Sequence, residues 1–234
     1  KAIDFLNTHR EELSWGDRRL FIQESSTIEI CHDKWNLWKF MELEGFNSPK
    51  TFLLAESDPP DIFPLIAKER SGEGGKNQSI IEDQRDLDYC MDKYPHHIYQ
   101  ELIQGREFSV DLFADIKGAP KLIVPRERLS VRGGEVMTSR IDMNKSIIGS
   151  VEALSRRLAL TGPCTIQGIL DGNGTFFFTD LNLRFGSGSV HTIAVGGNIP
   201  LMIYQEMAGQ SFFELSIQDQ SVMTRYPESI FHDS

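Results

Sequence analysis

The stretch Asp180-Leu181-Asn182-Leu183-Arg184 alternates polar with apolar side chains. In a β-strand, successive side chains point to opposite faces, so the aspartate, asparagine and arginine are expected on one face and both leucines on the other. The stretch therefore predicts a strand with one polar face and one buried face.

A hairpin is expected immediately before this strand. The segment Asp171-Gly172-Asn173-Gly174 contains strong turn signals and separates two strand-like runs. If the loop centres on its two middle residues, Gln167 pairs with Phe178 and lies diagonally across from Asp180 on the same face. A loop longer or shorter by one residue would break this alignment.

Gln167, Asp180 and Asn182 together offer one carboxylate and two amide oxygens. Mg²⁺ typically takes one or two carboxylates and completes its shell with phosphate oxygens and water. The guanidinium of Arg184 would face the same anion. These residues predict a metal and phosphate site, and the alternative is an edge strand with a solvated polar face.

The composition is that of an ordinary globular protein. The chain has 234 residues, of which 40% are hydrophobic and 25% charged, so it can bury a sizeable core. Its net charge of −10 argues against broad binding to nucleic acid or acidic membranes. Cys31, Cys90 and Cys164 lie far apart, which predicts unpaired, mostly buried thiols in a reducing compartment.

No membrane or export signal is present in the sequence. No run approaches the roughly 20 apolar residues of a membrane span, and no basic-then-apolar segment opens the chain. These features predict a soluble, cytoplasmic protein with no membrane partner. The chain opens at Lys1 inside helix-like sequence, so we expect that a piece of the natural protein precedes it.

The first 45 residues predict two helices, and the second of them begins at a candidate anion-binding residue. Residues 2–13 predict a helix, 19–22 a strand and 24–26 a turn. Residues 34–44 predict a helix with Asp33 as N-cap and Gly45 as its stop. Lys34 opposes the dipole of that helix, which either a bound anion or a solvated surface position would explain.

A glycine-rich segment follows two predicted strands. Residues 48–54 predict a turn into a strand, and residues 61–68 a second strand that ends at Lys68. In the segment 69–77, backbone N–H groups could cover phosphates, with Lys68 and Lys76 adding charge. The segment is not a Walker A loop, and a flexible surface loop is the alternative.

The middle of the chain predicts a hinge. Residues 79–94 predict a helix, and residues 97–103 and 107–115 two strands joined by a short connection. Nucleotide bases often bind in a cleft beside such a hinge. Residues 121–125 continue the sheet.

Four arginines follow within a short segment of this acidic chain. They either hold an anion or form salt bridges with surface acids. They are Arg126, Arg128, Arg132 and Arg140. Helices are expected at about 145–160 and from 196–200 to about 208, and no hydrolase triad or zinc-peptidase motif occurs.

The order of these motifs resembles the ATP-grasp superfamily, especially members like the carbamoyl-phosphate synthase large subunit and the amino-acid ligases. The resemblance rests on residues 31–34, 63–76, 99–101 with 105–107, Gln167, and 180–186. It implies an α+β fold in which two α+β lobes hold ATP between them. It also implies three parts: residues 1–30 end a preceding domain that is largely missing, 31–104 form the small lobe, and 105–234 the large lobe.

The resemblance also implies a role for each matched residue. Phosphate contacts would come from Lys34 and Lys68 and from the covering loop with Gly72, Gly74, Gly75 and Lys76. Adenine would bind at Glu101, Leu102 and Ile103, and the ribose at Glu107. The magnesium ligands would be Gln167, Asp180 and Asn182. Arg184, with Lys68, would act on the transferred phosphate, and Arg126, Arg128 or Arg132 would hold the substrate carboxylate.

The implied activity is that of an ATP- and Mg²⁺-dependent carboxylate–amine ligase that forms an acylphosphate, with Mn²⁺ as an alternative metal. Its partners would be small carboxylate and amine substrates and not nucleic acid. The resemblance is also compatible with a homo-oligomer. Asp180 stands where glutamate is common, and Leu183 replaces a usual proline. Two alternatives remain: carbamoyl-phosphate-synthase-type phosphorylation of bicarbonate or carbamate, and a non-catalytic ATP-binding module.

Overall fold

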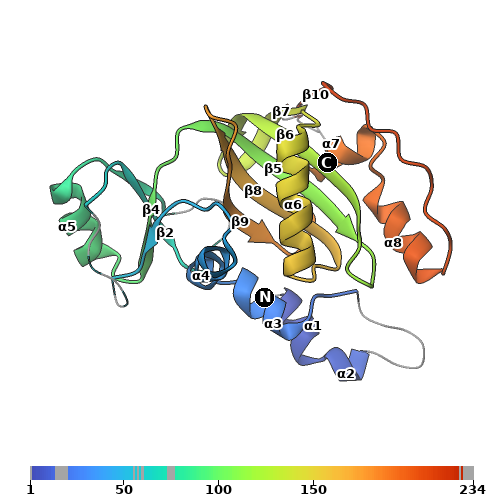
Figure 1. Ribbon diagram of the computed structural model, residues 1–234, viewed down its shortest axis with the longest axis horizontal. Coiled ribbons are helices and arrows are strands. Elements are labelled where there is room, and N and C mark those ends of the chain that lie inside the picture. Colours follow the sequence, from blue (N-terminus) through green and yellow to red (C-terminus); the bar gives the residue numbers. More distant parts are fainter. Residues whose placement is uncertain are drawn as a thin grey trace, which may run out of the picture.

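The computed structural model describes residues 2–13, 21–54, 56, 58, 61–72, 77–226 and 228. Two antiparallel sheets form the framework, and helices pack on both (Figure 1). The α+β architecture expected from the sequence is confirmed. In the part of the chain that is described, no helix is both long and apolar enough to cross a membrane.

The larger sheet has six strands in the order β10-β7-β6-β5-β8-β9. Its strands are β5 (Gly105–Ala114), β6 (Pro120–Arg132), β7 (Glu135–Ile141), β8 (Gly162–Asp171), β9 (Phe176–Asn182) and β10 (Val222–Thr224).

The smaller sheet has four strands in the order β1-β4-β2-β3, and it lies to the left of the larger one in Figure 1. Its strands are β1 (Thr51–Phe52), β2 (Leu65–Glu69), β3 (Ser79–Ile81) and β4 (His97–Glu101). The chain passes from this sheet to the larger one between β4 and β5.

The helices are α1 (Ala2–Thr8), α2 (Arg10–Leu13), α3 (Ser25–Cys31), α4 (Lys34–Glu44), α5 (Gln84–Lys93), α6 (Lys145–Arg157), α7 (Ser189–Ala194) and α8 (Ile199–Met207). The expected N-cap and stop of α4 are confirmed. The Asp33 side chain accepts hydrogen bonds from the main chain of Trp35 and Asn36, and Gly45 ends the helix with a φ of 71°.

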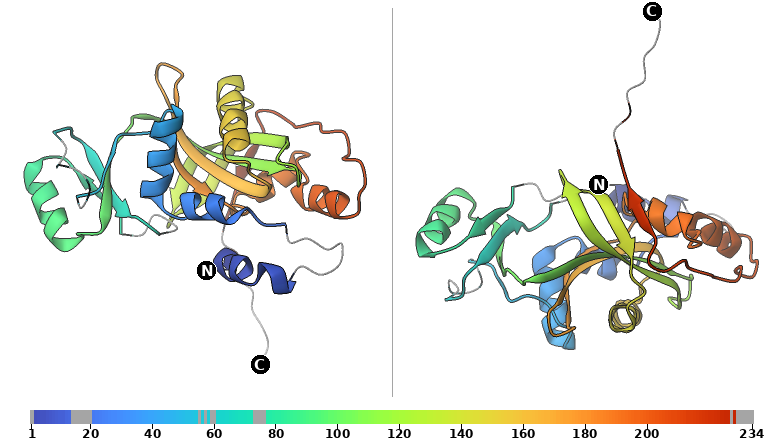
Figure 2. Two further views of the ribbon diagram at one scale, coloured as in Figure 1. Left: turned by 60° about the horizontal axis from the view of Figure 1, so that its bottom comes forward. Right: turned by 90° about the horizontal axis from the view of Figure 1, so that it is seen from above.

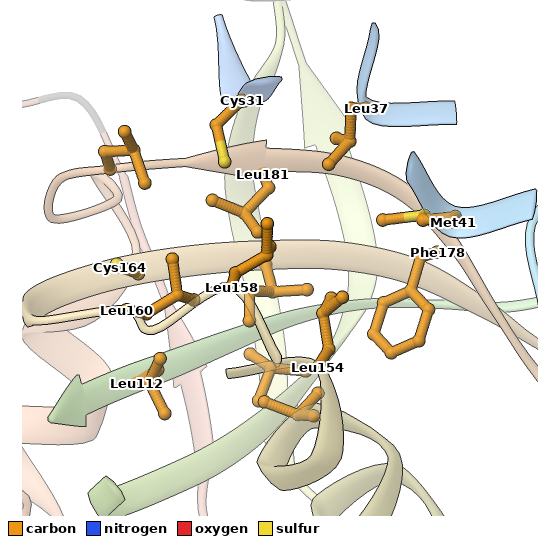
Figure 3. Packing of buried hydrophobic residues seen from close by; sticks show 14 of the residues in the cluster. Cys31, Leu37, Met41, Leu112, Leu154, Leu158, Leu160, Cys164, Phe178 and Leu181 are labelled. Carbon is orange, nitrogen blue, oxygen red and sulfur yellow. The ribbon is translucent and has the colours of Figure 1, made fainter. Parts of the chain in front are cut away.

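Helices α3, α4 and α6 all cover the same face of the larger sheet, with α3 and α4 near β9. Phe108, Val110 and Leu112 of β5 belong to this core. Figure 3 shows Leu37 and Met41 from α4 above β9, and Leu154 from α6 on the opposite side of the cluster. Cys31 and Cys164 lie in the same core, and all three cysteines are free and buried, as expected.

The other face of the larger sheet is covered in part by α7, α8 and the segment that leads to β10 (Figure 2). Phe113 of β5 and Val124 of β6 pack there against Ile199 and Met202 of α8. The remainder of this face carries the polar side chains described below.

Several expected elements differ in the structure. The helix expected at 2–13 is divided into α1 and α2, and the turn expected at 24–26 is instead the start of α3. Residues 19 and 20 of the expected strand 19–22 lie outside the described residues. Residues 79–81 form β3 rather than the start of a helix, because they pair with β2, and α5 begins after Asp83 caps it.

The sequence pattern also missed β7 and α7. β7 forms a hairpin with β6 across Gly133-Gly134, which is a local turn signal, and it also pairs with the distant β10. Ser189 and Thr192 of α7 donate hydrogen bonds to Asp111 of β5. Local patterns carry little information about such distant partners.

The hairpin between β8 and β9 has a different register from the expected one. Leu170 pairs with Phe176, so the loop is one residue longer than expected, and Gly168 rather than Gln167 pairs with Phe178. Next to Gly168, the ladder is irregular and β9 contains one extra, unpaired residue. Gln167 therefore lies directly opposite Asp180. The longer loop and the extra residue compensate each other, so Gln167 and Asp180 still lie on the same face of the sheet.

Candidate functional site

The face of the larger sheet that is opposite the α6 core is polar over most of its width. Ser109 of β5 lies opposite Gln167 of β8 on one side and Arg126 of β6 on the other. Residues that pair directly across antiparallel strands share a face. We call this surface the polar face; its members are Glu107, Ser109, Asp111, Arg126, Arg128, Thr165, Gln167, Asp180 and Asn182.

The three expected metal ligands lie together on the polar face. Gln167 pairs with Asp180, and the Asn182 side-chain amide donates a 3.3 Å hydrogen bond to Asp180 Oδ2. In the described part of the chain no group of three or more His, Cys, Asp or Glu side chains is arranged for a metal ion. One carboxylate with two amide oxygens nevertheless fits a magnesium ion that takes its other ligands from phosphate and water.

Lys34 lies between the start of the glycine-rich segment and β9. It is the first residue of α4, and its Nζ lies 4.0 Å from Asp180 Oδ1 and donates a 2.7 Å hydrogen bond to the carbonyl oxygen of Gly72. Lys34 Nζ thus lies between the start of the glycine-rich loop and the expected metal ligands.

Lys68 is buried at the same place. It lies on β2, with only 7% of its surface exposed. The pKa of Lys68 is lowered to about 8, chiefly by burial, against which the charge of Asp180 acts; Lys34 adds to the lowering, and Glu107 opposes it. The structure therefore brings Lys34, Lys68, Asp180 and Glu107 close enough for their charges to interact, although they come from four different elements.

Cys31 shares this electrostatic environment. Burial, followed by the negative charge of Asp180, raises the pKa of the Cys31 thiol to about 12. The thiol is therefore protonated at neutral pH and behaves as a core side chain.

The glycine-rich segment is described only in part. Gly72 lies close to Glu69, because an added Cβ at Gly72 would clash with Glu69 Oε2. Gly74, Gly75 and Lys76 lie outside the described residues. At the start of the segment, Arg70 Nε donates to both carboxylate oxygens of Asp33, at 2.9 and 2.7 Å.

The expected adenine-binding residues lie where the chain passes between the sheets. Glu101 N donates to the carbonyl oxygen of Lys50 at 2.8 Å, and Leu102 N donates to that of Pro64 at 3.1 Å. Ile103 follows directly, partly buried. This segment is held on one side by the smaller sheet.

Glu107 and Arg128 contact each other. Arg128 Nη1 donates a 2.7 Å hydrogen bond to Glu107 Oε1 across β5 and β6. The residue expected to bind ribose and one residue expected to bind a substrate carboxylate therefore form one ion pair.

Arg126 is bound to Asp111 inside the protein. Its Nε and Nη2 donate to the two Asp111 oxygens at 2.8 and 3.1 Å, and both side chains are almost fully buried. Ser189 and Thr192 of α7 also donate to Asp111, at 2.8 and 2.5 Å. Two nitrogen atoms of Arg126 are thus already used, and its expected role toward a substrate stays a prediction.

Arg132 and Arg184 lie apart from the buried ion pairs. Arg132 is exposed next to the β6–β7 turn, four residues beyond Arg128 and so roughly 13 Å further along the strand. Arg184 follows the end of β9 and is exposed, and its Nη1 donates to the carbonyl oxygen of Phe185 at 2.9 Å. Arg126, Arg128 and Arg140 all form salt bridges, but only Arg128 pairs with an exposed acid, Glu107; the partners Asp111 and Glu127 are buried.

Sequence reasoning missed Asp111 and Arg70 as members of the site region. Asp111 lies in an expected strand among apolar residues. Because a buried carboxylate without a partner is costly, its position in the sequence could have indicated a charged partner. Arg70 gave no such signal, because its partner Asp33 is far along the chain.

Comparison with known proteins decides the family. The profile of the ATP-grasp domain matches residues 31–188, which is more than half of the chain. The chain belongs to the ATP-grasp family. The matched range includes every candidate site residue, from Lys34 to Arg184.

The similar proteins have low sequence identity to this chain. A carbamoyl-phosphate synthase from Methanobrevibacter smithii is 23% identical over 150 residues, covering 62% of this chain and 36% of that protein. The L-amino acid ligase from Bacillus licheniformis is 19% identical with a TM-score of 0.68, covering 87% of this chain and 53% of the other. Biotin carboxylase from Campylobacter jejuni, solved with a β,γ-ATP ligand, is 16% identical with a TM-score of 0.73, covering 95% and 56%.

The structural likenesses show that the ATP-grasp fold extends over most of the chain. The chain spans between about a third and three fifths of the length of these relatives. Their activities belong to longer proteins.

Proposed function

We propose that this chain is the ATP-binding part of a Mg²⁺-dependent ligase that activates a carboxylate as an acylphosphate for attack by an amine. The observation that carries the proposal is the convergence of Lys34, Lys68 and Asp180 on the polar face, with Lys34 Nζ at 4.0 Å from Asp180 Oδ1. Two ammonium groups beside a carboxylate and two amides suit a polyphosphate with its metal ion.

In this proposal, each residue has a distinct task. Lys34 and Lys68 hold the phosphates, residues 101–103 hold the adenine, and Glu107 holds the ribose in the orientation set by Arg128. Gln167, Asp180 and Asn182 hold the magnesium ion, which screens the phosphate charge when bound. Arg184 faces the transferred phosphoryl group.

The reaction needs no protein nucleophile. A substrate carboxylate oxygen attacks the γ-phosphorus of ATP, the bond from that phosphorus to the bridging oxygen breaks, and ADP leaves. An amine then attacks the acyl carbon and phosphate leaves. The residues contribute by positioning and by stabilising negative charge.

The direct test is isothermal titration calorimetry of the chain with a non-hydrolysable ATP analogue, with and without Mg²⁺. Binding that strengthens with Mg²⁺ is the expected result. A chain that binds neither the analogue nor ADP under either condition would contradict the proposal.

The metal assignment has its own prediction. Asp180→Asn removes the only carboxylate of the expected metal set, so the affinity for the analogue should lose its dependence on Mg²⁺. Adenosine, which carries no phosphate, should bind this variant as it binds the wild type. The same calorimeter checks both, and equal Mg²⁺ dependence in variant and wild type would remove Asp180 from the metal site.

A second candidate is phosphorylation of bicarbonate or carbamate, as in carbamoyl-phosphate synthase. It is favoured by the similarity to the Methanobrevibacter smithii protein over 150 residues. ADP release that requires bicarbonate rather than an organic acid would favour this candidate. Binding without ADP release under either condition would favour a non-catalytic ATP-binding module.

A further inference from the structure

The two lysines proposed to hold phosphate come from elements that pack in different cores. Lys34 begins α4, whose Leu37 and Met41 side chains lie in the core of the larger sheet. Lys68 lies on β2, an inner strand of the smaller sheet. Neither element by itself fixes how the two ammonium groups lie relative to each other.

Asp33 and Arg70 join the chain beside both lysines. Arg70 Nε donates to Asp33 Oδ1 and Oδ2 at 2.9 and 2.7 Å, and the carbonyl oxygen of Arg70 accepts a 3.0 Å hydrogen bond from the main-chain N–H of Lys34. Asp33 directly precedes Lys34, and Arg70 lies two residues after Lys68. The contact therefore connects the first turn of α4 with the end of β2.

Stability alone gives little reason for this ion pair. The side chains of Arg70 and Asp33 are 36% and 18% exposed, and ion pairs near solvent typically contribute about 0–1 kcal/mol. Asp33 already caps α4 through the main chain of Trp35, at 2.9 Å. What Arg70 adds is a fixed geometry between two elements.

A similar pair elsewhere in the chain lacks this property. Asp83 caps α5, and Arg85 Nη2 lies 3.0 Å from Asp83 Oδ2. Both residues belong to the same helix start, so this pair joins no other element. It provides a matched control.

We propose that Asp33 and Arg70 are positioning residues for the phosphate site, an inference that rests on the proposed function. The pair holds the first turn of α4 against the end of β2, so that Lys34 and Lys68 contact the same polyphosphate. Its loss leaves both lysines present and the fold intact, and it moves one ammonium group away from the phosphates.

The experiment compares Arg70→Gln with wild type by calorimetry, using the Mg²⁺ complex of a non-hydrolysable ATP analogue and, separately, adenosine. The expected result is an affinity for the analogue about tenfold lower, with adenosine affinity unchanged. Arg85→Gln, the matched control, should change neither affinity. An unchanged affinity of Arg70→Gln for the analogue would overturn the inference, and so would an equal loss of adenosine affinity.

A second variant separates capping from positioning. Asp33→Ser keeps a good N-cap acceptor for α4 but removes the acceptor for Arg70. It should weaken analogue binding as much as Arg70→Gln does, and the double variant should show no further loss. Additive losses in the double variant would mean that the two residues do not act as a pair.

Lys68→Ala, measured in parallel, distinguishes failure of this inference from failure of the proposed function. If Lys68→Ala weakens binding and Arg70→Gln does not, the positioning role is wrong and the phosphate site stands. If Lys68→Ala binds the analogue like wild type, the phosphate assignment falls, and the positioning role falls with it.

Discussion

Two charged clusters lie at the polar face, and they differ in how many hydrogen bonds their carboxylates accept. In the first, Asp111 receives two hydrogen bonds from Arg126 and one each from Thr165, Ser189 and Thr192, whereas Arg126 Nη1 is buried without a hydrogen-bond partner among the described residues. We call this the closed cluster.

The second cluster consists of Lys34, Lys68, Asp180 and Glu107, and we call it the open cluster. Lys34 Nζ approaches Asp180 no closer than 4.0 Å. The pKa of Lys68 is lowered to about 8, which means that the carboxylates nearby compensate the buried ammonium only in part. The closed cluster therefore joins α7 to the larger sheet, whereas the open cluster is the one that we propose binds the phosphates of ATP.

The largest expected effect is on the closed cluster. Asp111→Ala leaves the Arg126 guanidinium buried without its partner, so the free energy of unfolding should fall by about 3–5 kcal/mol. Urea denaturation measures this change. Leu112→Ala, at the next residue of β5 but in the apolar core, should cost about 2–5 kcal/mol, and a much smaller cost for Asp111→Ala would mean that the cluster is not closed.

The open cluster should behave in the opposite way. Lys68→Met should weaken binding of the Mg²⁺ complex of an ATP analogue at least tenfold, or about 1.4 kcal/mol, because a charged phosphate contact is lost. The free energy of unfolding should not fall, since a desolvated ammonium is replaced by an apolar chain of similar length. Calorimetry and urea denaturation test the two halves, and Arg132→Gln, at the exposed hairpin end, should change neither.

The smallest effect is a dependence on pH. Because the pKa of Lys68 is about 8, its ammonium loses a proton as the pH rises through that value. The neutral amine attracts phosphate less, so affinity for the analogue should fall between pH 7 and 9 by several-fold. In Lys68→Arg, whose side chain stays charged, affinity should change less over this range, and parallel pH profiles would contradict the role of Lys68.

Local sequence patterns predicted much of the framework. The helix at Lys34, with Asp33 as its cap and Gly45 as its stop, and the hairpin around 171–174 follow from side-chain chemistry and turn propensity within a few residues. The face shared by Gln167 and Asp180 was also expected, although the register that produces it was wrong.

The sequence by itself determined the alternation of polar and apolar residues, the helix ends and the membership in the ATP-grasp family. Only the tertiary structure decided that Arg126 pairs with Asp111, that Arg128 pairs with Glu107, and that Arg70 joins Asp33 beside Lys34. Periodicity and capping act within a few residues of chain, whereas the partner of a charge depends on which distant segments the fold brings together.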